Sequence, residues 1–348
     1  MRVTVIGAGV AGLACGVALA ERGACVEIIE RSPHLGQSAA AWQAGGMLAP
    51  WCESQSTEPL VARLGEESID WWASRCPDVV RNGTLVVAHA RDLAELERFA
   101  RRAERYTWVQ GDHISVLEPQ LSGRFSRGLL FRDEAHLDPR AALKALAERV
   151  EHLGGRIRFD VEGGVGGALA QAPVDRGSEM PPARVVDCRG LAARDVLADL
   201  RAVRGEMVLL RAPGVVLTRP VRVLHPRMPL YIVPRADGLF MLGATMIESD
   251  AQRNVSARSL LELLSAAYSV HPAFGEAEVV EIGVGLRPAF PDNLPRIRQR
   301  DGVLYVNGLY RHGFLLAPAL ARMTADVVLQ NSFYPEVMDE DSRQRRPA

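Results

Sequence analysis

Hydrophobic and polar positions at the start of the chain alternate in blocks that predict a β-α-β unit. Residues 3–6 are a short β-branched run, which is typical of a buried parallel strand. Residues 10–18 repeat apolar side chains with helical spacing, and Gly23 stands where a C-terminal glycine cap belongs. A second apolar run, residues 25–29, follows at once. The pattern therefore predicts a strand, a helix and a second, parallel strand.

Two kinds of pattern follow along the rest of the chain. Short apolar runs first alternate with amphipathic helices, one of which Asp138 caps and Pro139 opens. Residues 205–286 instead carry closely spaced strands and turns with one helix near residues 256–270, which favours antiparallel pairing. After residue 287 the chain returns to a strand and a helix.

We therefore predict an α/β (α+β) protein with two interleaved domains. One is a Rossmann-like nucleotide-binding domain, and the other is an antiparallel-sheet domain that holds a substrate. The nucleotide-binding domain is assigned residues 1–83, 139–204 and 287–337, the substrate domain residues 84–138 and 205–286, and a frayed tail residues 338–348.

Gly7, Gly9 and Gly12 form a G-x-G-x-x-G fingerprint between the first strand and the first helix. The first glycine permits a tight turn, the second lets a pyrophosphate approach the backbone, and the third lets the helix pack on the strand. Glu30, at the end of the next strand, can accept both hydrogen bonds of an adenosine ribose diol. Strand, glycines, helix and acid in this order predict an ADP-binding site, which leaves FAD and NAD both open.

The composition is that of an ordinary globular protein. Of the 348 residues 48% are hydrophobic, and the formal net charge of -1 argues against a nucleic-acid or membrane partner. The five cysteines form no C-x-x-C pair, so we expect neither a disulfide framework nor a metal site and favour a cytoplasmic location. The uncharged residues 3–20 also resemble a signal peptide, but their glycines make a poor continuous helix.

Further motifs are spread over nearly the whole chain. They are SAAAWQAGGML from Ser38, LYIVPR, LGATM, GLRPAFPDNLPRI and YRHGFLLAPA. Together with the fingerprint, these stretches resemble the D-amino-acid-oxidase family of flavoproteins, most closely its glycine-oxidising branch. The chain departs from the family pattern by the Trp42-Gln43 insertion, and at Leu309 and His312, where histidine and asparagine are favoured.

The resemblance implies FAD held without a covalent bond, and oxidative deamination of glycine or a similar small amino acid or amine. Oxygen would take the electrons, and the products would be an oxo acid, ammonia and hydrogen peroxide. The step would feed thiamine thiazole synthesis. The resemblance also implies a homo-oligomer such as a tetramer.

Three side chains are candidates for binding the substrate carboxylate. Arg287 ends an apolar strand, where its guanidinium group could form two parallel hydrogen bonds with a substrate carboxylate. The alternative is a salt bridge to an acidic residue of the protein. The Tyr231 hydroxyl can donate to the same carboxylate, or the ring is a core residue. Arg311 precedes the helix that starts near Gly313, so it is either a second cation at the substrate and flavin edge or a cap on nearby carbonyls.

Two methionines and one histidine complete the expected surroundings. Met47 and Met246 are expected to line and narrow the substrate pocket, although both also fit as ordinary core thioethers. His312 is expected to be a surface or packing histidine and not a catalytic base. The exposed amides of residues 313–315 and the helix dipole would stabilise the negative charge of a reduced flavin.

The cofactor is expected to contact the fingerprint, the loop after the second strand and the start of the C-terminal helix, and the resemblance adds positions in other loops. The full set is Gly7, Gly9, Val10, Ala11, Gly12, Glu30, Arg31, Ala40, Ala41, Gly45, Gly46, Met47, Val161, Gly190, Arg287, His312, Gly313, Phe314 and Leu315.

Four alternatives stay open. A sarcosine or D-amino-acid oxidase is the nearest, although a flavin-linking cysteine is missing after Cys188. An FAD-dependent dehydrogenase with a quinone or protein acceptor would differ only in its oxidant. A catalytically silent flavoprotein would bind flavin that no amine reduces. A protein that binds only NAD would give no function to Arg311 and the helix that follows it.

Overall fold

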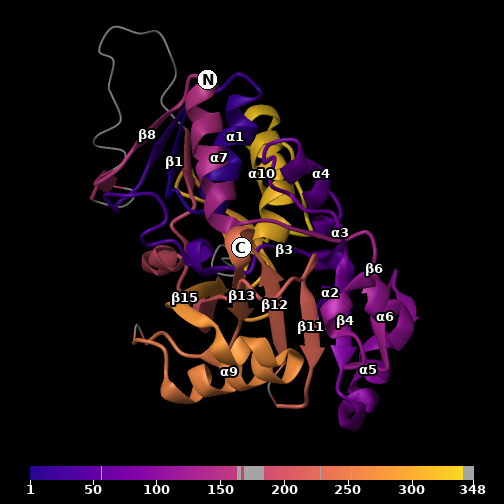
Figure 1. Ribbon diagram of the computed structural model, residues 1–348. Helices are drawn as coiled ribbons and strands as arrows, with labels where there is room; N and C mark the ends of the chain where they lie inside the picture. The colour runs from indigo at the N-terminus through magenta and orange to yellow at the C-terminus, as the bar shows by residue number, and fades with distance from the viewer. Residues whose placement is uncertain (56, 163–165, 168–183, 228, 252, 340–348) are drawn as a thin grey trace, which may run out of the picture.

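The computed structural model describes residues 1–55, 57–162, 166–167, 184–227, 229–251 and 253–339. The β-α-β pattern of the N-terminus builds the first of two large sheets (Figure 1). In spatial order this six-stranded sheet comprises β16 (Arg296–Arg300), β17 (Val303–Asn307), β9 (Arg184–Asp187), β1 (Arg2–Ile6), β2 (Cys25–Ile29) and β8 (Arg156–Arg158). All neighbours pair in parallel except β16 and β17, which are antiparallel.

Apolar residues cover both faces of this sheet, as its continuous hydrophobic runs predict. One face packs against α1 (Val10–Ala20), α7 (Pro139–His152) and α10 (Gly313–Gln330), which lie together in Figure 1. The other face packs against two separate segments, one with Ala193 and Leu197 and the other with Phe290. The predicted cap of α7 is confirmed, because the Asp138 carboxylate accepts the backbone amides of Arg140 at 2.7 Å and Ala141 at 3.1 Å.

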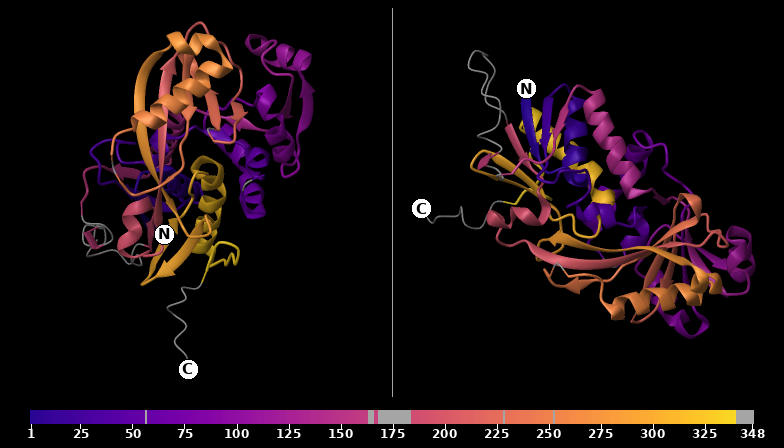
Figure 2. Two further views of the ribbon diagram at one scale, coloured as in Figure 1. Left: turned by 90° about the horizontal axis from the view of Figure 1, so that it is seen from below. Right: turned by 60° about the vertical axis from the view of Figure 1, so that its left-hand side comes forward.

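The second sheet has nine strands. In spatial order they are β14 (Ile247–Glu248), β10 (Arg201–Arg211), β13 (Leu239–Gly243), β12 (Leu230–Pro234), β11 (Val221–Leu224), β4 (Thr84–Ala88), β6 (Arg127–Phe131) and β5 (Thr107–Gln110), and β15 (Glu278–Ala289) pairs with β10. The predicted antiparallel pairing is correct for this sheet with one exception, because β4 and β11 are parallel. Helix α9 (Ala257–Val270) packs across β10, β12 and β13 (Figures 1 and 2).

Shorter elements connect the strands of the two sheets. The helices are α2 (Pro50–Glu53), α3 (Pro59–Gly65), α4 (Ser68–Ala73), α5 (Leu93–Ala100) and α6 (Gly111–Leu117), and a two-stranded ribbon is formed by β3 (Met47–Leu48) and β7 (Ala135–His136). The 3₁₀ helices are η1 (Ala40–Gln43), η2 (Ala90–Asp92), η3 (Pro119–Leu121), η4 (Gly190–Asp195), η5 (Ala236–Gly238) and η6 (Pro272–Glu276).

The domain boundaries stay a prediction. Strands β10 and β15 run through the proposed boundaries at residues 205 and 287, so the two units share continuous strands. Residues 340–348 of the expected tail lie outside the described residues. In the part of the chain that the structure describes, the helices are too short or too polar to cross a bilayer.

Strand β16 is absent from the predicted elements for a physical reason. Its sequence, RIRQR, is too charged to read as a strand. Arg298 is nevertheless buried, because it pairs with Asp199 at 2.7 Å and with Asp339 at 2.7 Å. These partners lie far away in the sequence, so no local pattern could reveal them.

Gly12 is where α1 lies closest to the end of β1. A Cβ atom at Gly12 would lie 1.8 Å from the carbonyl oxygen of Gly7. We expect Gly12→Ala to force the helix off the strand and to lower the free energy of unfolding by about 1–3 kcal/mol or more. Thermal unfolding would measure this against Gly214→Ala, whose added Cβ meets nothing within 4 Å. Equal melting temperatures for the two variants would contradict this packing.

Candidate functional site

The loop between β1 and α1 opens on a large cavity. Gly7 has a φ of 99°, and a Cβ there would lie 2.9 Å from the Cys188 carbonyl oxygen, so only glycine fits. A Cβ at Gly9 would meet only Ala39, at 4.0 Å, which leaves the backbone accessible. No side chain caps the start of α1, so its first amides are available to an anion such as a pyrophosphate.

Glu30 lies at the edge of the same cavity in a fixed orientation. Its carboxylate accepts the backbone amides of Ala8 at 2.8 Å and Ser32 at 3.0 Å, and the Ser38 hydroxyl at 3.1 Å. A carboxylate offers about four acceptor positions, so it can still accept from a ribose diol. The position and the chemistry fit the adenosine end of a dinucleotide.

The turn between β17 and α10 explains the position of Arg311. The Asn307 side chain accepts the Gly308 amide at 2.8 Å and donates to the Gly190 carbonyl at 2.8 Å. Gly308 and Tyr310 then adopt positive φ values of 77° and 50°. The Tyr310 amide donates to the Pro288 carbonyl at 3.0 Å, one residue after Arg287. The turn therefore brings Arg311 to the end of β15.

The first turn of α10 is fixed by α3 and α4. The Trp72 indole is fully buried and donates from Nε1 to the Phe314 carbonyl at 2.8 Å. Gly65 of α3 lies so close to Leu315 that a Cβ there would be 2.7 Å from the leucine side chain. The helix start, predicted at Gly313, is confirmed, and its amide end borders the cavity.

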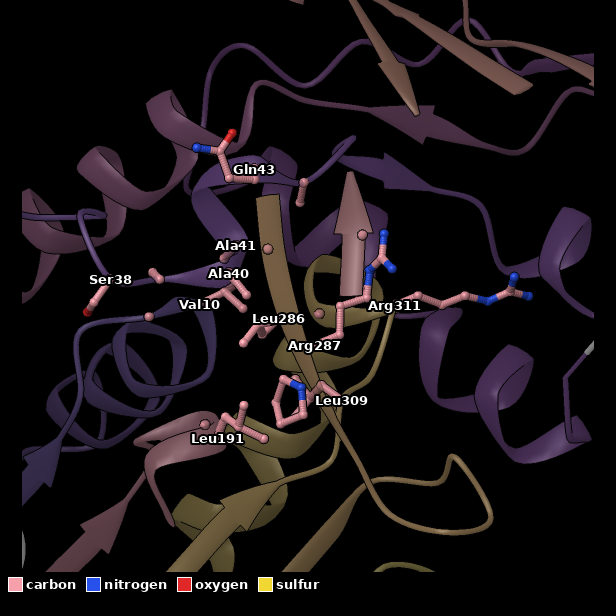
Figure 3. A pocket seen from close by; sticks show the side chains of 18 of the residues that line it. Val10, Ser38, Ala40, Ala41, Gln43, Leu191, Leu286, Arg287, Leu309 and Arg311 are labelled. Atoms are coloured by element: carbon pink, nitrogen blue, oxygen red, sulfur yellow. The ribbon is translucent and has the colours of Figure 1, made fainter. Parts of the chain in front are cut away.

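The cavity has a volume of about 1310 Å³ and is lined by elements of both sheets. In Figure 3, Ser38 lies on one side of the pocket, and Arg287 and Arg311 lie together on the other. Every residue predicted to contact cofactor or substrate lines this cavity except Gly12, which packs against Gly7. A cavity with glycine-rich backbone at one end and cations at the other suits a long dinucleotide and a small anion beside it.

Arg287 has no acidic partner among the described residues. Its Nη1 donates to the Thr245 carbonyl at 3.1 Å, and no described carboxylate lies within 4.0 Å of its guanidinium. The group lies over Gly205 of β10, where a Cβ would be 2.1 Å from Nη2. Burial lowers the pKa of the Arg287 guanidinium, and the positive charge of Arg311 adds to this effect. The alternative of a protein salt bridge is wrong for the described chain.

The Tyr231 ring is held between two glycines. A Cβ at Gly243 would lie 2.5 Å from the ring, and one at Gly45 would lie 2.9 Å away. Arg235 fixes the Gly45 loop, because its Nη2 donates to the carbonyls of Ala44 at 3.2 Å and Gly45 at 3.0 Å. Burial raises the pKa of Tyr231, so the hydroxyl keeps its proton and can donate it to an anion.

Arg311 is paired with Glu53, which the sequence does not predict. Arg311 Nη2 lies 2.6 Å from one Glu53 oxygen, and Arg222 Nη1 donates to the other at 3.1 Å. Burial alone would raise the Glu53 pKa, but Arg311 and Arg222 outweigh burial and lower it to about 2. An acid of the protein therefore orients the Arg311 guanidinium.

His312 is buried, so the expectation of a surface histidine is wrong and the packing alternative applies. Burial lowers its pKa to about 3, and the nearby arginines add to this effect. The ring is therefore neutral, and its Nε2 accepts from Arg311 Nε at 3.3 Å. A nitrogen used in this way cannot also act as a general base.

A protonated carboxyl group lies behind the Glu53 ion pairs. Glu134 is 1% exposed and accepts the Cys52 amide at 2.6 Å. Burial raises its pKa to about 8, and the charge of Glu53 adds to this effect. Glu134 is therefore neutral near pH 7, which leaves Glu53 as the single charge of this carboxyl pair.

The two methionines both line the cavity but differ in exposure. Met47 is half-buried and packs against the cluster of Met207, Val233 and Met241. Met246 is 54% exposed, so it is not an ordinary core thioether. Its sulfur lies 3.5 Å from Arg311 Nη1 and 3.7 Å from the Tyr310 hydroxyl.

Glu53 and Arg222 are both absent from the predicted site, and of these two only Arg222 has a local signal in the sequence. It stands between Val221 and Val223 on β11, and both valines belong to the core of the other face. An arginine alternating with core valines must face the opposite side of the sheet, here the cavity. Glu53 closes a helix of four residues and has no such pattern.

Comparisons with known proteins agree on one family. A family model described as FAD dependent oxidoreductase (DAO) matches residues 2–327. A thiamine biosynthesis oxidoreductase, ThiO, of Rhizobium etli is 52% identical over 337 residues, 97% of this chain and 99% of the relative. A glycine oxidase of Bacillus licheniformis is 27% identical over 365 residues, 99% of this chain and 97% of the relative. The crystal structure of glycine oxidase from Geobacillus kaustophilus matches with a TM-score of 0.75 and 25% identity, over 94% of each chain.

Glu134 should make stability depend on pH. Its folded pKa of about 8 lies above the ordinary value of 4.5, so the folded protein keeps a proton that the unfolded chain releases between these values. The free energy of unfolding therefore falls as the pH rises through this window. Glu134→Gln keeps an acceptor for the Cys52 amide and removes the titration.

We expect Glu134→Gln to match the wild type at about pH 5 and to be more stable above about pH 8. Denaturant unfolding of both proteins across this range would measure the difference. Two curves that stay parallel from pH 5 to 8 would show that Glu134 ionises normally in the folded protein.

Proposed function

Because the chain belongs to the DAO family of FAD-dependent oxidoreductases, we propose that it oxidises glycine or a similar small amino acid. Substrate, water and oxygen would give an oxo acid, ammonia and hydrogen peroxide. We further propose that the product serves the thiazole branch of thiamine synthesis, in line with the name of the Rhizobium etli relative. A homo-oligomer and a cytoplasmic location stay sequence-based predictions.

The observation that carries this proposal is the uncompensated Arg287 guanidinium. It lies in the same cavity as the Glu30 cradle and the amide end of α10. A substrate carboxylate would supply the planar, bidentate partner that the described protein groups do not. The Tyr231 hydroxyl, which has no protein partner among the described residues, would donate a further bond. These two contacts would fix the substrate by its acid end.

The charges around the substrate position favour an anion. Arg222, Arg287 and Arg311 contribute three positive charges and Glu53 one negative charge, which leaves an excess of two. A carboxylate entering this site is attracted, and an amine without a carboxylate is repelled. The excess also favours loss of the ammonium proton from a bound amino acid, because the neutral amine is not repelled.

The residues of the dinucleotide cradle fit FAD, which when bound would accept the hydride from the substrate Cα and pass two electrons to oxygen. Glu30 would hold the ribose diol, and the fingerprint amides would hold the pyrophosphate. The amides of residues 313–315 would stabilise negative charge at the far end. The protein's part is therefore orientation and electrostatics, without a general base.

The test of the proposal is anaerobic mixing of the purified holoprotein with glycine, sarcosine and D-alanine. We expect at least one of them to bleach the flavin absorbance, and readmitted oxygen to restore it with release of hydrogen peroxide. Reduction without reoxidation by oxygen would indicate a dehydrogenase. A flavin that none of the three amines reduces would refute the oxidase function while leaving the family assignment intact.

Gly205→Ala tests the carboxylate contact without replacing a substrate-binding side chain. The new Cβ would lie 2.1 Å from Arg287 Nη2 and displace the flexible end of that side chain. We expect kcat/KM to fall on the order of 10- to 100-fold, the scale of a charged hydrogen bond pair. Arg287→Lys, which keeps the charge and loses the planar fork, should fall between this variant and wild type.

Gly214→Ala is the matched control, because it adds the same methyl group in open space. Thermal unfolding and flavin content should be alike in Gly205→Ala, Gly214→Ala and the wild type. Unchanged kcat/KM in Gly205→Ala would remove Arg287 from the substrate site.

A further inference from the structure

Met246 lies at the mouth of the cavity in contact with two hydrogen-bond donors. It follows β13 and precedes β14, and it is 54% exposed. Its sulfur faces Arg311 Nη1 at 3.5 Å and the Tyr310 hydroxyl at 3.7 Å. An exposed thioether is accessible to a peroxide, and the two donors beside its sulfur can bind the oxygen atoms of the peroxide.

Arg311 links this sulfur to substrate binding. Its Nη2 is committed to Glu53 at 2.6 Å, whereas its Nη1 faces the thioether. A thioether is a weak acceptor, so a substrate carboxylate can displace it from Nη1. A stronger acceptor at the same place would compete with the substrate.

We propose that Met246 is a site of oxidation by hydrogen peroxide, and that its sulfoxide lowers the affinity of the cavity for carboxylates. The oxidant rests on the proposed function, whose product would form in the cavity that Met246 lines. The sulfur lone pair attacks one peroxide oxygen, the O–O bond breaks, and the leaving oxygen departs as water after proton transfer. Methionine and hydrogen peroxide thus give methionine sulfoxide and water.

The two donors assist the step and stabilise its product. Arg311 and Tyr310 can donate to the departing oxygen and then to the sulfoxide oxygen, which is a far stronger acceptor than sulfur. The sulfoxide would hold Arg311 Nη1 in place of the substrate. Accumulated product would therefore slow the enzyme, and methionine sulfoxide reductase would restore it.

Met1 and Met47 are internal references. The Met1 side chain is 44% exposed, a fraction similar to the 54% of Met246, but Met1 lies outside the cavity. Met47 lines the cavity but is half-buried and packed against other apolar side chains. Comparing the three separates the effect of exposure from the effect of the donors.

The experiment treats the holoprotein with hydrogen peroxide in the absence of amine, and follows sulfoxide at each methionine by peptide mass spectrometry. We expect Met246 to oxidise faster than Met1 and Met47. The affinity for acetate, read from the flavin spectrum, should fall roughly fivefold, the scale of one hydrogen bond. Methionine sulfoxide reductase should reverse the loss.

Two variants sharpen the result, each compared with its own untreated sample. In Met246→Leu, acetate affinity should no longer respond to peroxide, and in Tyr310→Phe the preference for Met246 over Met1 should shrink. Oxidation of Met1 as fast as Met246, or unchanged acetate affinity after Met246 is oxidised, would overturn the proposal.

A turnover arm, with glycine and oxygen in the presence or absence of catalase, separates this proposal from the proposed function. If peroxide is released and Met246 stays reduced, the link to the product is wrong. If no peroxide is released, the proposed function fails, and the arm with added peroxide still decides whether Met246 is the preferred site.

Discussion

One carboxylate shared by two guanidinium groups determines the geometry of the cavity. Glu53 comes from α2, Arg222 from β11 and Arg311 from the turn before α10, so three distant parts of the chain meet at one point. Removing a shared acid of this kind leaves two half-buried cations facing each other, which costs several kcal/mol in comparable sites. Because Glu134 stays neutral, the negative charge at this point is fixed at one. The orientation of Arg311, and with it the contact between Arg311 Nε and the His312 ring, depends on this arrangement.

Features governed by local rules could be predicted from the sequence. The β-α-β unit follows from short apolar runs around glycines, and the start of α7 follows from Asp138 and Pro139. Arg287 stood out because an arginine at the end of an apolar strand needs a partner, and the structure leaves that place to a ligand. The motifs spread along the chain predicted the family and FAD, and the comparisons support both.

Features that depend on contacts between distant residues could not be predicted. The parallel pairing of β4 with β11 joins strands more than a hundred residues apart, and β3 has only two residues. The sequence around Arg298 predicts a surface residue, because its ion-pair partners Asp199 and Asp339 lie in distant parts of the chain. The role of Glu53 could not be predicted either, because a single acid after a tryptophan and a cysteine forms no periodic pattern or motif.

The order of strands in the six-stranded sheet has a consequence for biosynthesis. The fingerprint leaves the ribosome almost 300 residues before β17, which flanks β9, and α10, which covers α1. Until then the nascent sheet exposes an unpaired edge of β9, and the cavity has no far wall. Cofactor capture must therefore wait until β17 and α10 have been made, so the cofactor-free nascent chain is the species that cellular chaperones have to protect.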